Sequence, residues 1–243
     1  MQPTFLPWIG YFDLIAQVDT FVLYDDVQFA KQSWQTRNRI PTSNGITQLT
    51  VPLQNSPLDT LIFDIKIDNS KPWQKKHLKS IFYNYQKAPF FKEIYTFMES
   101  FFDHRFEMLS DMHTHFIRSI AQKIGINTVI LKSSELEVDK SNRVQRLIDI
   151  CKKVDAEVYI STSGAYGYMQ EENGNVQFTT NNMQLLYHNY QHPTYPTLFK
   201  DFTPYMCILD LLFMVGFEGA LPIILQGRKS PKKHIEFPQS AAE

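Results

Sequence analysis

Short strands are predicted where apolar residues form runs or alternate with polar ones. Residues 20–24 (TFVLY) form a run rich in β-branched and aromatic side chains, which is typical of a buried strand. Residues 37–42 and 46–53 flank Asn44-Gly45, the strongest short signal for a β-hairpin. Further strands are predicted over residues 61–67, 128–131, 157–160 and 184–190.

Helices are predicted where apolar residues recur every three or four positions. Pro72 suits the first turn of a helix, and Pro89 interrupts the pattern that follows it. Gly125 and Gly216 are placed to end helices, and the pair Ser141-Asn142 is expected to cap one. The predicted helices cover residues 10–17, 73–86, 90–102, 105–124, 142–154 and 205–215.

Strands and helices alternate in two parts of the chain, which favours an α/β fold. We expect a mixed or mostly parallel sheet with flanking helices, a β-hairpin near residues 37–53 and a helical insertion near residues 72–124. The chain of 243 residues is long enough for one large domain, and we predict a single domain over residues 1–225. Residues 226–243 are polar and basic and contain prolines, so a flexible tail is expected there.

Composition argues against several classes of protein. There are 24 Lys and Arg against 25 Asp and Glu, a balance that disfavours a protein that coats nucleic acid or an anionic membrane. Cys151 and Cys207 form no zinc-binding pair and are typical of a reducing cytoplasm. The longest apolar run, residues 205–217, contains Asp210 and is too short to span a bilayer. Aromatic residues make up 14% of the chain, which fits either a site for a flat ligand or a core rich in phenylalanine.

Residues 25–39 combine side chains of very different chemistry. Asp25 and Asp26 follow a predicted strand, and ligands of α/β sheets bind at the carboxyl ends of strands, where a carboxylate can act as a general base. Arg37 and Arg39 are suited to clamp a phosphate or a carboxylate, and Trp34 to stack on a sugar or a base. The alternative is a structural ion network in which the two carboxylates pair with Lys31 or with an arginine.

Two later segments carry further candidate groups. Residues 161–165 (STSGA) follow a predicted strand and lack the glycine patterns of phosphate-binding loops; they fit an anion-binding loop or a plain strand–helix connection equally well. His192 precedes a proline and therefore lies in extended or turn backbone. It serves either as an acid–base group or as an ordinary surface histidine.

Asp210 lies in an otherwise apolar predicted helix, and an isolated buried carboxylate is costly. It is therefore expected to pair with an arginine or to reach into a polar cleft. His113 and His115 are two residues apart, so on a helix they point to different faces, and no metal site is predicted. The sequence assigns no cofactor.

Taken together, these segments resemble the WbqC-like protein family over about residues 1–216. The matching motifs are Gln2-Pro3-x-Phe5-Leu6-Pro7-Trp8-x-Gly10-Tyr11-Phe12, the segment from Asp19 to Trp34 with Arg37-Asn38-Arg39-Ile40, Tyr85-x-Lys87-Ala88-Pro89-Phe90-Phe91, residues 160–168, His192-Pro193-x-Tyr195, and Phe202-x-Pro204 through Asp210-Leu211-Leu212-Phe213. The chain departs from the family pattern at Thr36, Thr197, Cys207 and Met214. Relatives commonly have a short strand before the residue that matches Gln2, where this chain has Met1.

The resemblance implies a bacterial or archaeal protein linked to O-antigen and other surface polysaccharides. It implies a transferase that modifies a sugar or amino-sugar precursor, for example by attaching glycine or another amino acid. The expected partner is therefore a small molecule, a sugar phosphate or an aminoacyl donor.

Two other functions are kept as alternatives. The first is an enzyme related to nucleotidylyltransferases, because the loop from Pro7 to Gly10 stands where those enzymes bind phosphate. Trp8 and Tyr11, however, stand near where their paired histidines belong. The second is a non-catalytic ligand-binding accessory protein.

In the transferase hypothesis, Asp25 or Asp26 is the general base and His192 supplies a second acid–base group. The residues predicted to bind substrate are Gln2, Trp8, Tyr11, Lys31, Trp34, Arg37, Arg39, Ser161 and Tyr195.

Overall fold

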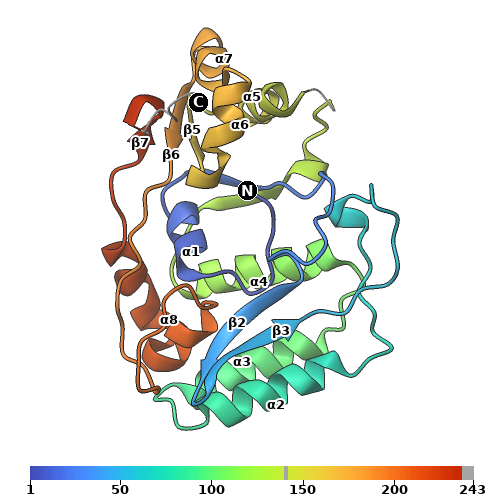
Figure 1. Cartoon of the computed structure of the whole chain (residues 1–243), viewed down its shortest axis with the longest axis vertical. Coiled ribbons are helices and arrows are strands. Elements are labelled where there is room, and N and C mark those ends of the chain that lie inside the picture. Colours follow the sequence, from blue (N-terminus) through green and yellow to red (C-terminus); the bar gives the residue numbers. More distant parts are fainter. Residues whose placement is uncertain (140–141, 237–243) are drawn as a thin grey trace, which may run out of the picture.

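The computed structural model describes residues 1–139 and 142–236, which form eight α-helices and three small sheets (Figure 1). The fold is α/β, as the sequence predicts. Two of the sheets contain parallel strand pairs. Strand β1 (Thr20–Leu23) pairs with β4 (Val129–Lys132), and β5 (Val158–Ser161) pairs with β6 (Gln184–Tyr187).

The predicted hairpin is present as β2 (Arg37–Thr42) and β3 (Gly45–Thr50), paired from Arg37 opposite Thr50 to Thr42 opposite Gly45. Gly45 has a φ of +123°, a conformation that residues with a side chain rarely adopt. This requirement explains why the Asn-Gly signal located the turn.

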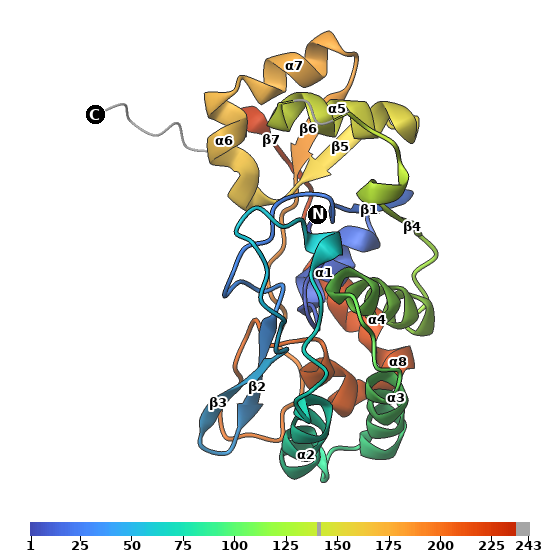
Figure 2. The same cartoon turned by 90° about the vertical axis from the view of Figure 1, so that its right-hand side faces the viewer.

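The helical insertion is also confirmed. It consists of α2 (Trp73–Tyr85), α3 (Phe91–Asp103) and α4 (Leu109–Lys123), with α2 and α3 at the end of the molecule that carries the hairpin (Figures 1 and 2). At the opposite end lie α5 (Arg143–Lys153), α6 (Tyr166–Glu171) and α7 (Gly174–Thr180). Asn142 caps α5 by accepting a hydrogen bond from the N–H of Gln145 at 2.8 Å. Its predicted companion Ser141 lies outside the described residues.

The molecule has two apolar interiors. The larger, which we call the lower interior, includes Phe5, Phe12, Phe116 and Phe213, each at most 1% exposed, and it packs α1 (Ile9–Ile15), α4 and α8 (Leu209–Gln226) together. The smaller, upper interior lies under α5 to α7 and includes Ile148 and Phe178. Many of the aromatic residues therefore form core, the second of the two explanations that composition allows.

Helix α8 is broken at Gly216, whose φ of +69° and ψ of −177° are not helical. The predicted end of the helix at Gly216 is correct, but the chain resumes a helix from there to Gln226. Of the described helices, α8 alone is long and apolar enough to cross a membrane by length and composition. Half of that window is buried, and α8 packs on α1, α3 and α4.

Two expectations need correction. Residues 61–67 do not form a strand: they make a 3₁₀ turn over Ile62–Asp64 with isolated bridges on either side, because the main chain there bonds in turn to Asp25 and to α4. Residues 226–236 are not a flexible tail. Within them β7 (Lys232–Lys233) pairs antiparallel with β6, and Arg228 forms an ion pair with the buried Asp13. Residues 237–243 lie outside the described residues.

Candidate functional site

Asp25 follows β1 and is fully buried, and its carboxylate is held by neutral donors. Ser110 donates its hydroxyl to Oδ2 at 2.7 Å, the N–H of Ser134 donates to Oδ1 at 3.1 Å, and the hydroxyl of Ser134 donates to Oδ2 at 3.1 Å. These donors come from the start of α4 and from the residues after β4. The carboxylate is thus satisfied by the protein itself.

Asp26 is also engaged within the fold. Its carboxylate forms a buried ion pair with Arg146 of α5 and accepts a hydrogen bond from the hydroxyl of Ser133 at 2.5 Å. The guanidinium of Arg146 also lies 5.4 Å from the centre of the Tyr24 ring. Asp26 therefore has the structural ion-network geometry that the sequence left open, with Arg146 as its cation rather than Lys31, Arg37 or Arg39.

His192 has the opposite character, because one of its nitrogens is left without a partner. Nδ1 lies 2.7 Å from the carbonyl oxygen of Pro193, and since a carbonyl only accepts, Nδ1 carries the hydrogen and Nε2 is the acceptor in the neutral ring. Nε2 is buried and bonds to no group in residues 1–139 and 142–236. Burial lowers the pKa of His192, which favours the neutral ring, in which Nε2 carries a lone pair.

Aromatic rings surround this imidazole. The Trp8 ring lies parallel to it, with an interplanar angle of 14° and 6.1 Å between centroids, and the Tyr205 ring is 5.1 Å away. Tyr205 is 53% exposed and has a φ of +61°, a conformation seldom held by a bulky residue unless the fold imposes it. Together with Tyr195 and Phe202, these residues make up what we call the Trp8–His192 cluster.

Asp210 supports the cluster from within the core. It accepts hydrogen bonds from the hydroxyls of Tyr195 at 3.0 Å and Tyr85 at 2.9 Å. Burial raises the pKa of Asp210 to about 6, although the two tyrosine hydrogen bonds act in the opposite direction. The prediction that Asp210 pairs with an arginine is wrong, because the hydroxyls of Tyr85 and Tyr195 bind its carboxylate instead.

Arg39 and Trp34 adjoin the cluster through the main chain. The N–H of Cys207 donates to the carbonyl of Arg39 at 3.0 Å, and Cys207 also forms a bridge with Trp8. The guanidinium of Arg39 lies 5.1 Å from the ring centre of Trp34, which is 50% exposed. Arg37 is two residues earlier on β2 and therefore shares the face of Arg39, whereas Lys31 is exposed in the preceding loop.

Asn38 shapes the N-terminal loop that leads to Trp8. Its buried amide donates to the carbonyls of Phe5 at 3.0 Å and Leu6 at 2.8 Å, and Leu6 has a φ of +44°. Gln2 accepts a hydrogen bond from the side chain of Gln35 at 2.9 Å. Tyr11 faces the lower interior, where its hydroxyl donates to the carbonyl of Gln2 at 3.2 Å.

Ser161 lies at the end of β5 and is buried with the upper part of the molecule. The side chains of Tyr159 and Tyr168 hydrogen-bond to it, and its carbonyl accepts the N–H of His188 at 2.7 Å. The structure thus places Trp8, His192 and Tyr195 together, with Arg39 and Trp34 beside them. Asp25 with Asp26, and Ser161, belong to two other polar groups.

A fourth polar group was missed by sequence reasoning. Asp13 of α1 is fully buried and accepts hydrogen bonds from His188 Nε2 at 2.8 Å, Arg228 Nε at 2.8 Å and Gln17 Nε2 at 2.5 Å. Its signal in the sequence is a single charge within the apolar run 9–15. The ring of His188 stacks on Tyr190, which contacts Trp8, so this group is one ring removed from the Trp8–His192 cluster.

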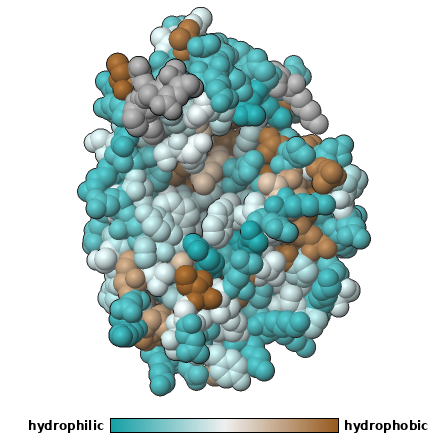
Figure 3. All heavy atoms as spheres, in the orientation of Figure 1, coloured by the Kyte–Doolittle hydropathy of each residue, from teal (hydrophilic) through white to brown (hydrophobic). Residues whose placement is uncertain are grey.

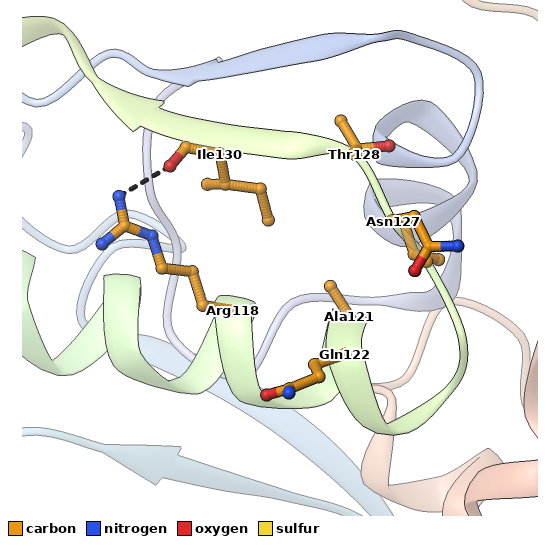
Figure 4. Close-up of a pocket in the computed structure, with 7 residues that line it drawn as sticks. Arg118, Ala121, Gln122, Asn127, Thr128 and Ile130 are labelled. Carbon is orange, nitrogen blue, oxygen red and sulfur yellow. Dashed lines mark hydrogen bonds between the residues drawn. The ribbon is translucent and has the colours of Figure 1, made fainter.

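Two surface hollows of the described residues are lined by none of the predicted site residues. The first, of about 290 Å³, lies between α4 and β4, where Arg118 donates to the carbonyl of Ile130 at 2.6 Å and so covers part of the outer edge of β4 (Figure 4). The second, of about 510 Å³, is lined by Gln17, Ile160 and Arg228 among others. Hydrophilic side chains cover most of the face seen in Figure 3, and apolar ones appear in a recess below the upper part. The described residues contain no group of three His, Cys, Asp or Glu arranged to hold a metal ion.

Comparison with known proteins agrees with the motifs. The sequence profile of the WbqC-like protein family matches residues 2–220. The chain is 34% identical over 222 residues to the uncharacterized protein Rv1507c of Mycobacterium tuberculosis (strain ATCC 25618 / H37Rv), an alignment that covers 90% of this chain and 94% of that protein. No solved structure matches. With nine-tenths of its length covered by the family profile, the chain belongs to the WbqC-like protein family.

Proposed function

We propose that this protein is a cytoplasmic transferase that binds a sugar or amino-sugar precursor of a surface polysaccharide at the Trp8–His192 cluster. The observation that carries this proposal is the buried Nε2 of His192, which has no partner in the described residues and lies among aromatic rings. A buried acceptor without a partner is costly in a folded protein, so its retention supports a role with a ligand. The chemical classes of the donor and of the acceptor are taken from the family resemblance.

His192 is the group best placed to move a proton. In the proposed reaction, Nε2 takes a proton from the attacking amine or hydroxyl as that atom forms its new bond, and the donor's leaving group departs with the bonding electrons. The hydrogen bond from Nδ1 to Pro193 holds the tautomer that this step needs. A positioned base of this kind is worth ~10²–10⁴-fold in rate.

The surrounding residues suit the substrate class. The exposed ring of Tyr205, which lies 5.5 Å from the Trp8 ring, offers a face on which a sugar ring packs. Arg39, whose guanidinium stacks near Trp34, supplies a cation for a phosphate or carboxylate of the substrate. Asp25 and Asp26 are occupied by the fold, so we assign the base to His192 and leave the two carboxylates as positioning groups for the ends of β1 and β4.

A thermal-shift screen tests the proposal first, because a ligand that binds the folded state raises the melting temperature. Nucleotide sugars, sugar phosphates and aminoacyl donors are screened singly and in pairs. The hit is then titrated against Tyr205→Ala and His192→Asn. We expect Tyr205→Ala to weaken binding and His192→Asn to bind but not turn over.

Tyr83→Ala is the matched control, because Tyr83 is also an exposed tyrosine (62% against 53%) but lies on α2. The proposal fails if no compound of these classes binds, or if Tyr205→Ala and Tyr83→Ala behave alike.

A second function, that of a non-catalytic ligand-binding protein, is favoured by the full occupation of both Asp25 and Asp26. In that case a ligand binds to the wild-type protein, but no product forms with any pair of the screened compounds. The nucleotidylyltransferase alternative gains no such support, because a Cβ at Gly10 would lie 2.2 Å from the Trp8 ring. The glycine is thus covered by an indole and is not open to a phosphate.

A further inference from the structure

The hollow of about 510 Å³ lies where the C-terminal segment crosses α1 and β5. Its lining includes two cationic side chains and no acidic one; the lining residues are Ala16, Gln17, Ile160, Arg228, Lys229, Ser230 and Pro231. Two cations and an amide thus face one hollow. Of its lining residues only Ile160 falls in a motif of the sequence analysis, and the proposed function does not use this hollow.

Arg228 is held in position by Asp13. Its Nε donates to Oδ1 of Asp13 at 2.8 Å, and its Nη2 donates to the Asp13 carbonyl at 3.2 Å. These two bonds take two of the five N–H donors of the guanidinium. The side chain remains 33% exposed although its partner is fully buried, so the rest of the guanidinium is open to the hollow that Arg228 lines.

The main chain that carries these cations is anchored on both sides. Gln191 donates its N–H to the carbonyl of Gly227 at 2.8 Å, and Lys229 donates its N–H to the carbonyl of Asn189 at 3.1 Å. The side-chain amide of Asn189 donates to the carbonyl of Ser230 at 3.1 Å. A cation on such an anchored segment loses little additional backbone entropy when it binds a ligand.

The charges set the class of ligand. Arg228 and Lys229 bring two positive charges, and Asp13 is the one carboxylate bonded to Arg228 in the described residues. The excess positive charge, with hydrogen-bond donors on Gln17 and Ser230, suits an oxyanion. We propose that this hollow is an anion-binding site that takes the phosphate or carboxylate group of a small molecule.

Calorimetric titration of the full chain tests this site at constant ionic strength, with sodium phosphate in one arm and sodium acetate in the other. We expect saturable 1:1 binding of at least one of the two anions, and the arm that saturates identifies the group. Lys229→Gln should weaken that binding ~10-fold, since a hydrogen bond to a charged group is worth that much. Lys229→Arg should retain it, and Ser230→Phe should abolish it by filling the hollow.

Lys153→Gln is the matched control: it removes an exposed lysine from α5, with the same change of charge, and should bind as wild type. His192→Asn should also bind as wild type, which separates this site from the Trp8–His192 cluster. Lys229 and Ser230 are exposed, so their variants are expected to fold. Absence of saturable binding, or equal affinity in wild type, Lys229→Gln and Ser230→Phe, overturns the proposal.

Discussion

Tyr195 links His192 to the core, because its ring lies 5.9 Å from the imidazole while its hydroxyl donates to Asp210 Oδ2 at 3.0 Å. The same carboxylate receives the hydroxyl of Tyr85, which stacks on Phe213 at 4.3 Å. An acidic residue in an apolar helix thus fixes two tyrosines, one of which forms a wall of the candidate site.

Asp210 should make the protein more stable at mildly acid pH than at neutral pH. Its folded-state pKa is about 6, against 3.8 when free, so between these values the folded protein holds a proton that the unfolded chain releases. The contribution to the free energy of unfolding therefore falls as pH rises through both values, by about 3 kcal/mol over the whole titration. Urea unfolding at a series of pH values measures it.

Asp210→Asn removes this titration and serves as the reference for that experiment. The difference in unfolding free energy, variant minus wild type, should rise by about 3 kcal/mol between pH 3 and pH 8. A difference that stays constant over that range would show that the buried carboxyl does not titrate with a raised pKa.

Arg146→Met should destabilise the protein strongly. It leaves Asp26, which is 8% exposed, as a buried carboxylate without its cation. Breaking one side of such a pair costs about 3–5 kcal/mol. The double variant Asp26→Asn/Arg146→Met should recover part of this loss in urea unfolding, whereas additive losses would show that the two residues do not interact.

Asn38→Ala should loosen the N-terminal loop and thereby the position of Trp8. It removes two hydrogen bonds and leaves the carbonyls of Phe5 and Leu6 buried without those donors, at a cost of about 2–3 kcal/mol. Asn38→Asp should cost more, because a carboxylate would face two carbonyl oxygens. If the variants unfold at the same urea concentration as wild type, the loop does not depend on Asn38.

Gly10→Ala should displace the Trp8 ring, since a Cβ at this position would meet it at 2.2–2.6 Å. We expect a loss of about 1–3 kcal/mol and altered tryptophan fluorescence. Gly167→Ala on α6 is the control: nothing lies within 4 Å of its Cβ, so that variant should be neutral or slightly stabilising. Equal behaviour of the two variants would contradict the tight packing of Trp8 on Gly10.

The sequence predicted most elements because their signals are local. Asn44-Gly45 specified the hairpin turn, and Gly216 marked the break in α8, since both positions need positive φ. The prediction of a strand over residues 61–67 was wrong. Apolar and polar side chains alternate there, but the main chain bonds to other segments of the fold and not to a neighbouring strand of a sheet. The C-terminal segment was misjudged because what holds it, the ion pair of Arg228 with Asp13, joins residues more than 200 positions apart.

The site was predicted less well, and for a physical reason. Trp8, His192 and Tyr195 were named and do come together, but sequence gives no measure of which polar groups the fold itself satisfies. The serines that occupy Asp25 lie 85 and 109 residues away, and no local pattern announces them. Asp13 could be recognised in the sequence as a charge within an apolar helix. Its ion-pair partners, however, are far away in the sequence and could not be predicted from it.

Because the molecule has two apolar interiors of different size, we expect its two parts to unfold in a defined order. The upper unit, residues 142–187, has the smaller interior and is tied to the rest in part by the ion pair of Arg146 with Asp26. Amide hydrogens of α5 and β5 should therefore exchange with solvent sooner than those of α4, which is built into the larger interior. The upper unit should therefore open to solvent while the larger interior is still closed, so partial unfolding of this protein begins at the end that carries α5 to α7.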